Sequence, residues 1–149
     1  MHGGRVAVLC ICCVLAVLLA DAAAASPSRC MSKQVTFHVL AQGENQTAAI
    51  DFLATNRGST CRLTGEASLT IVQSGRRFSG VRGNPIRARI DVVIRPGQTS
   101  IVIANWANWC GSRTNLRIRG AVGKRVTTAR LLSLPVCLYP KHPSRLAKV

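Results

Sequence analysis

Hydrophobic and polar residues alternate along most of the chain. The clearest run extends from Ile86 to Ile94, where every second side chain is apolar and most of the others are charged. A period of two residues is typical of a β-strand with one face buried and the other in solvent. The other runs that we interpret as strands cover residues 33–40, 48–54, 67–73, 99–106, 114–119 and 124–132. The pattern predicts about seven strands and no helix beyond the first 25 residues.

Turn-forming residues separate these runs. Glycine, proline and asparagine concentrate at residues 42–46, 55–60, 74–85, 96–97 and 120–123, and such clusters favour turns and loops. Short strands at regular spacing with turns between them predict an all-β Greek-key sandwich. We expect residues 26–138 to form this single domain. Residues 139–149 lack the alternation and are basic, so we expect a disordered tail.

The first 25 residues differ in composition from the rest. A short basic opening ends at Arg5, an apolar run covers residues 6–20, and small residues lead to Ser26. This order predicts a secretory signal peptide. The apolar run is shorter than the roughly 20 residues that a membrane-spanning helix needs. We expect cleavage after Ala25, with Ala22 as the competing site and an uncleaved anchor as the alternative.

Four cysteines follow this segment, namely Cys30, Cys61, Cys110 and Cys137. In an exported chain, an even number of cysteines implies disulfides and an oxidising compartment. Cys30 and Cys61 return to the open end of the first predicted hairpin, and Cys110 and Cys137 lie at similar distances on either side of the last one. We therefore predict the bridges Cys30–Cys61 and Cys110–Cys137. Because no Cys-x-x-Cys pair occurs and no histidine lies close to a cysteine in sequence, we expect no metal site and no cofactor.

The chain is strongly basic. It has 20 Lys and Arg against 5 Asp and Glu, a net charge of +15, and 16 of the 20 cations are arginine. Such an excess favours anionic partners. Export argues against nucleic acid, which leaves acidic polysaccharides, phosphate-bearing cell-wall polymers and anionic lipid head groups. The alternative is a solvated basic surface without a dedicated ligand, since codon bias alone enriches Arg, Ala, Gly and Val.

Three segments resemble one known family. They are TNRGSTCRLTG at residues 55–65, IRPG at 94–97 and WANWCG at 106–111. Together they are similar to the secreted actinobacterial family catalogued as domain of unknown function 4232, over residues 30–137. The resemblance implies an exported immunoglobulin-like module, and it implies no activity because the family has none assigned. The high positive charge departs from what the family would lead us to expect.

Catalytic patterns are missing from the sequence. His38 and His142, the two histidines after residue 25, have no neighbour in a known motif, and neither a G-x-S-x-G segment nor a phosphate-binding glycine loop occurs. Catalysis needs a nucleophile or base with a partner that orients it. We therefore predict that the chain is not an enzyme.

Arginines are the candidate binding residues. Arg87 and Arg89 on one predicted strand would join Arg117 and Arg119 on another in a single basic face, provided that both strands belong to one sheet. The glycine-rich loop at 74–85 adds three more arginines. The candidate anion-binding residues are Arg76, Arg77, Arg82, Arg87, Arg89, Arg117 and Arg119.

Trp106 and Trp109 are the candidate aromatic contacts for a carbohydrate ring. Three residues apart at the end of an extended strand, they are expected to project to opposite faces. At most one would then pack in the core, while the other lies nearer solvent. Packing beside the Cys110 bridge is the favoured interpretation, and ligand contact is the alternative.

These features predict a secreted or cell-envelope, non-catalytic module that binds an anionic polymer. The alternative is a soluble extracellular effector or inhibitor that uses the basic loop at 74–85 against a partner protein. The motif Asn45-Gln46-Thr47 matches a glycosylation site, which we interpret as incidental in a bacterial chain. We make no prediction of the oligomeric state.

Overall fold

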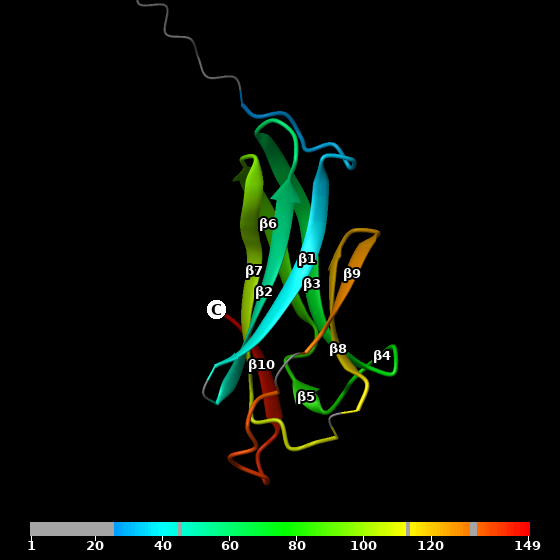
Figure 1. The fold of residues 1–149 in the computed structure, drawn as a ribbon, viewed down its shortest axis with the longest axis vertical. Helices are drawn as coiled ribbons and strands as arrows, with labels where there is room; N and C mark the ends of the chain where they lie inside the picture. Colours follow the sequence, from blue (N-terminus) through cyan, green and yellow to red (C-terminus); the bar gives the residue numbers. More distant parts are fainter. Residues whose placement is uncertain (1–25, 45, 113, 132–133) are drawn as a thin grey trace, which may run out of the picture.

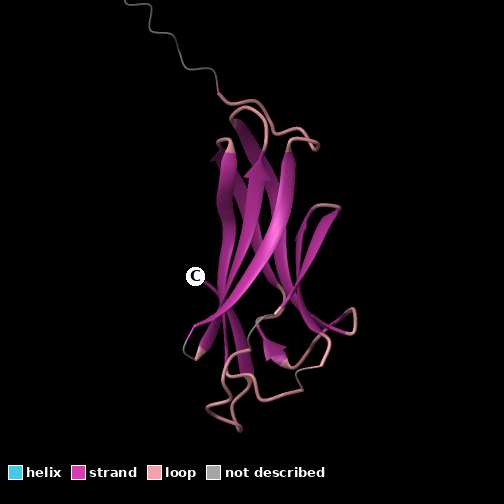
Figure 2. Ribbon diagram, in the orientation of Figure 1, coloured by secondary structure: helices cyan, strands magenta, loops and turns pink. Residues whose placement is uncertain are grey.

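The computed structural model describes residues 26–44, 46–112, 114–131 and 134–149. The predicted signal peptide lies outside the described residues, as does Asn45 of the glycosylation motif. Regular structure in the described part consists of β-strands alone (Figures 1 and 2). No helix of this part is long and apolar enough to cross a membrane.

Within the described ranges, ten strands form two sheets that pack face to face (Figure 1). Sheet 1 has the order β1-β2-β7-β10-β5, and sheet 2 has the order β4-β3-β8-β9 with β6 beside β3. The strand bounds are β1 Val35–Glu44, β2 Thr47–Asn56, β3 Cys61–Gln73, β4 Arg76–Arg77, β5 Val81–Arg82, β6 Ile86–Ile94, β7 Gly97–Ala107, β8 Leu116–Val122, β9 Arg125–Arg130 and β10 Ser144–Lys148.

The predicted all-β, immunoglobulin-like sandwich is confirmed. β1 and β2 form the first hairpin, and the chain then changes sheet after β2, β4, β5, β6, β7 and β9, so that strands close in sequence are shared between the two sheets as in a Greek key. Ile50 and Phe52 of β2 are fully buried, while β6 alternates between buried apolar and exposed charged residues. The period-two pattern therefore identified both the strands and the faces that they bury.

The central strand of sheet 2, β3, is longer than the sequence indicated. It begins at Cys61 rather than at residue 67, and it pairs with β6 through Leu69 and with β8 from Ala67 onward. Near the start of β3, the inward residues Cys61 and Leu63 are apolar and buried, but the next inward position is occupied by Gly65. Because glycine presents no side chain, the hydrophobic pattern is interrupted there although the strand is not.

The turn predicted at residues 120–123 is shorter than expected. β8 continues to Val122, so Gly120 lies inside a strand. A Cβ atom at Gly120 would stand 2.7 Å from side-chain atoms of both Phe52 and Val39. Gly120 is therefore a packing position, where the missing side chain leaves room for the buried Phe52 ring.

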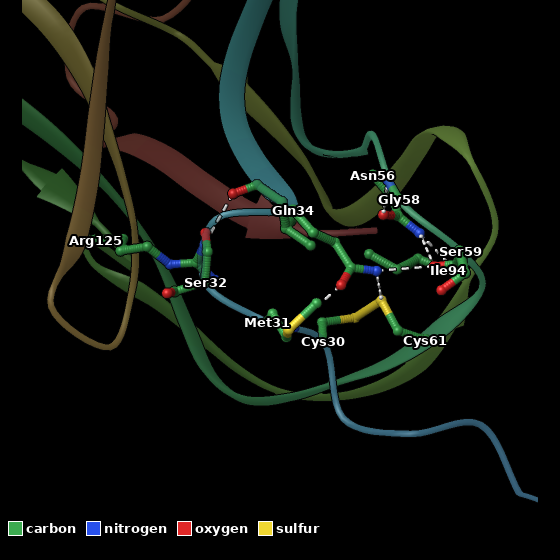
Figure 3. The surroundings of a disulfide bond; sticks show 11 residues. Cys30, Met31, Ser32, Gln34, Asn56, Gly58, Ser59, Cys61, Ile94 and Arg125 are labelled. Atoms are coloured by element: carbon green, nitrogen blue, oxygen red, sulfur yellow. Dashed lines mark hydrogen bonds between the residues drawn. A yellow bond between two sulfur atoms is a disulfide. The ribbon is translucent and has the colours of Figure 1, made fainter.

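Both predicted disulfides are present. Cys30–Cys61 joins the segment before β1 to the start of β3, and Cys110–Cys137 joins the segments that follow β7 and β9. At the first bridge, the side-chain amide of Gln34 donates to the Ser59 carbonyl at 2.8 Å and contacts Cys61 Sγ at 3.1 Å (Figure 3). Two disulfides in a small β domain are compatible with an extracellular location.

The prediction of a disordered tail over residues 139–149 is wrong. β10 lies between β7 and β5 in sheet 1 (Figure 1). Leu146 is 3% exposed, and Ser144 Oγ accepts a hydrogen bond of 2.6 Å from Trp106 Nε1. Only these two residues of β10 are buried, and one of them is polar. The segment therefore shows no apolar alternation.

Leu146→Ala tests whether β10 belongs to the core. Truncating a buried leucine removes its packing and leaves a cavity, so we expect a loss of about 2–5 kcal/mol in the free energy of unfolding. Lys148→Ala, on the exposed end of the same strand, is the control and should change it by less than about 0.5 kcal/mol. Urea unfolding measures both variants, and equal stability of the two would contradict the placement of β10.

Candidate functional site

The outward face of sheet 2 brings the predicted arginine pairs together. Arg87 and Arg89 lie on β6, Arg117 and Arg119 lie on β8, and both strands pair with β3. All four side chains are exposed, while their neighbours along each strand are buried. The condition set by the sequence, that both strands share one sheet, is met. Arg87 pairs with Ser68 and Arg119 pairs with Thr70, so the nearest members of the two pairs are two strands and two residues apart, roughly 12 Å.

The strand register adds a row of arginines across four strands. Arg130 of β9 pairs with Arg117, Arg117 pairs with Val72, and Val72 pairs with Arg77 of β4. Paired residues of antiparallel strands project to the same side of a sheet. Although Val72 faces outward, it is only 5% exposed, as expected where long side chains stand on either side of it.

We call the outward arginines of sheet 2 the basic face. Its residues are Arg62, Arg77, Arg87, Arg89, Arg117, Arg119 and Arg130. The sequence missed Arg62 and Arg130 as candidates. The position of Arg130 at the end of an alternating run could have indicated that it is exposed. That it lies beside Arg117 follows only from the register of β9 with β8.

Ion pairs occupy one end of the basic face. Arg62 binds Asp91 through two hydrogen bonds of 2.5 and 2.8 Å, and Arg87 binds Glu66 at 2.8 Å. The hydrogen bond from Arg62 holds the pKa of Asp91 below its ordinary value, and the pKa of Arg62 is raised in turn. These pairs are solvent-exposed, so each contributes little to stability, but they reduce the positive charge of this end.

The other end keeps its full positive charge. We call Arg77, Arg117, Arg119 and Arg130 the arginine cluster. Among the residues that the structure describes, no carboxylate lies within ion-pair distance of these four side chains. All four are exposed, and like charges held on the same side of one sheet produce a local positive potential. The candidate anion site is therefore the part of sheet 2 formed by β4, β8 and β9.

A groove lies beside the ion-paired end. Its volume is about 910 Å³, and Arg29, Arg62, Arg89 and Arg125 contribute to its walls. On one side of β3, Arg62 is paired with Arg29 through an isolated bridge, and pairing resumes only at Ala67, where β8 begins to lie beside β3. The groove lies in the gap between these two contacts. Residues 63–66 thus have no strand beside them on that side within the described part of the chain.

Arg125 has a structural role in the wall of this groove. Its guanidinium, which lies beside Ser32 (Figure 3), donates to the main-chain carbonyls of Ser32 and Val35 at 3.1 and 2.9 Å. It also lies 4.3 Å from the centre of the Phe37 ring. Partial burial lowers the pKa of Arg125. The residue connects the start of β9 in sheet 2 to the start of β1 in sheet 1.

Two of the predicted arginines lie outside the basic face. Arg82 belongs to β5 of sheet 1, where it pairs with Arg145 of β10. Arg76 comes directly before Arg77 on β4 and therefore projects to the opposite side of that strand. The loop at 74–85 contributes β4 to one sheet and β5 to the other, which local sequence does not reveal.

The prediction that the tryptophans project to opposite faces is wrong. Trp106 and Trp109 are 0% and 5% exposed, and their ring centroids are 5.2 Å apart. β7 ends at Ala107, and Asn108 adopts a left-handed conformation with φ of 55° that breaks the strand alternation. Trp109 then packs against Phe78 at 5.1 Å. Neither indole offers an open face to a carbohydrate, so both are core residues.

Comparison of the chain with protein-family models, with curated proteins and with solved structures finds no match. In the described ranges, no group of three or more His, Cys, Asp or Glu side chains is placed to hold a metal ion. The candidate site therefore rests on the geometry and charge of the arginines.

The pKa of Asp91 provides a test of the ion-paired end. Because the folded-state pKa lies below 3.8, the pair stabilises the fold above that pH and ceases to do so as the pH falls through the lowered value. Arg62→Gln removes the main cause, so the pKa of Asp91 should rise towards 3.8. NMR titration of the side-chain carboxyl measures it, with Arg87→Gln as the control. An unchanged midpoint in Arg62→Gln would contradict the pairing.

Proposed function

We propose that the protein is an exported, non-catalytic β-sandwich that binds an anionic polymer through the basic face of sheet 2. One observation carries the proposal. The arginine cluster places four exposed arginines on the outward side of one sheet, three of them on the paired strands β8 and β9 and one on β4 across β3, with no carboxylate of the described residues to neutralise them. Guanidinium groups bind phosphate, sulfate and carboxylate oxygens through paired hydrogen bonds.

A polymer fits this surface better than a small anion. The cluster lies on the outward side of a sheet, where a single exposed charge contact contributes at most about 1 kcal/mol. Useful affinity therefore requires several contacts at once. In a polymer the anions are linked, so once the first anion is bound, the others bind without a further loss of translational and rotational entropy. Acidic polysaccharides and phosphate-bearing cell-wall polymers have this property.

Export is supported by the sequence of residues 1–25 and by the two disulfides. The resemblance to the secreted family with unknown function agrees with it. The alternative of an effector that contacts a protein through the loop at 74–85 has less support, because that loop is divided between β4 in sheet 2 and β5 in sheet 1.

Chromatography on immobilised heparin with a salt gradient tests the proposal. The wild type should elute above physiological ionic strength, where isolated exposed charges are already largely screened. Arg117→Gln with Arg119→Gln removes two contacts of about 0.5–1 kcal/mol each, so we expect affinity to fall roughly 5- to 30-fold and elution to move to lower salt.

The control is Arg62→Gln with Arg87→Gln. It removes the same charge from the same sheet, but from side chains that already bind Asp91 and Glu66. It should therefore elute close to the wild type. Elution of the wild type at or below physiological salt would contradict the proposal, as would equal shifts of the two double variants.

A further inference from the structure

Arg82, which the structure separates from the basic face, lies in a second group of polar residues. The outward register of sheet 1 runs from Thr47 of β2 to Ala107 of β7, then to Arg145 of β10 and Arg82 of β5. Both arginines are exposed. Ala107 is the smallest side chain of this row, so the row has a recess between Thr47 and Arg145.

A cleft of about 570 Å³ occupies this recess, and we call it the C-terminal cleft. Thr47, Ala107 and Arg145 line it together with Gln46 from the first hairpin and Tyr139 from the segment before β10. This volume lies within the range of small-ligand sites. Tyr139 is 61% exposed, although an aromatic ring of this size is usually more buried.

The wall that carries Tyr139 is held rigidly by Asn108. Asn108 Oδ1 accepts from the main-chain N–H groups of Leu138 and Tyr139 at 3.0 and 2.9 Å, and Nδ2 donates to the carbonyls of Tyr139 and His142 at 2.9 and 3.0 Å. The Cys110–Cys137 bridge fixes the same segment just before it. The His142 ring packs edge-on against Tyr139 at 5.7 Å. The exposed tyrosine is therefore presented by an ordered loop, which lowers the cost of binding.

We propose that the C-terminal cleft binds a carboxylate-bearing sugar residue of an acidic saccharide. The Tyr139 ring stacks on the apolar face of the sugar, and the guanidinium of Arg145 binds the carboxylate through paired hydrogen bonds. Arg82 adds positive charge beside Arg145. The Gln46 amide and the Thr47 hydroxyl supply hydrogen bonds for ring hydroxyl groups. This site is separate from the arginine cluster, since the two lie on the outward faces of different sheets.

The test is an NMR titration of the full ¹⁵N-labelled domain with two probes, methyl β-D-glucuronide and methyl β-D-glucoside. A single sugar contact corresponds to a dissociation constant on the order of 1 mM. We expect the glucuronide to bind at least tenfold more tightly than the glucoside and to shift the amide signals of Thr47, Ala107 and Tyr139. Tyr139→Ala should weaken the glucuronide at least tenfold, and Arg145→Gln should abolish the preference between the probes.

The matched control is Arg95→Gln, an exposed arginine of the turn between β6 and β7 that belongs to neither proposed site, and it should leave glucuronide binding unchanged. Well-dispersed spectra of each variant verify that it folds. The proposal would be overturned by equal binding of both probes, by no binding at about 50 mM, or by shifts confined to β8 and β9. The last outcome would still agree with a basic face on sheet 2, so the two proposals fail separately.

Discussion

The register of β3 between β6 and β8 is the constraint on which the rest of the structure depends. Leu69 pairs with Ile86 on one side and with Gly120 on the other. The absent side chain of Gly120 leaves the space that Phe52 fills from the opposite sheet. A slip of one residue would turn every side chain to the other face, and would press Arg119 or Ala121 against that ring. The packing that buries the core therefore also fixes the arginines on the outside of sheet 2.

The segment from Trp106 to Cys110 organises the other end of the sandwich. Trp106 binds Ser144, Asn108 binds the loop at 138–142, Trp109 fills the core beside Phe78, and Cys110 bonds to Cys137. The side-chain hydrogen bonds of Trp106 and Asn108 and the disulfide of Cys110 all reach the segment after β9. The run that looked like an aromatic binding platform is thus an attachment for β10. Its contribution to the proposed saccharide site is indirect, because the loop that it fixes forms one wall of the C-terminal cleft.

The features that depend on the local pattern of residues, namely strands and disulfide pairing, could be predicted from the sequence. Alternation located β2 and β6, and the symmetry of two hairpins identified both disulfides. Its failures have physical causes. β10 buries too few apolar side chains to produce a pattern, and one left-handed residue, Asn108, reverses the direction of Trp109. The candidate arginines could be divided between the two sheets only once the sheet order was known. Arg82 lies beside Arg145 of β10, a strand distant in sequence, whereas Arg130 lies beside Arg117 through the register of the β8–β9 hairpin.

The central claim is that local geometry, rather than the net charge of +15, determines where a polyanion binds. The most direct measurement is an NMR titration that follows the arginine Nε–H signals during addition of a short heparin fragment. Signals of Arg117, Arg119 and Arg130 should shift first and furthest, whereas those of Arg62 and Arg87, whose side chains bind carboxylates, should respond weakly. Shifts of equal size at every exposed arginine would contradict the account.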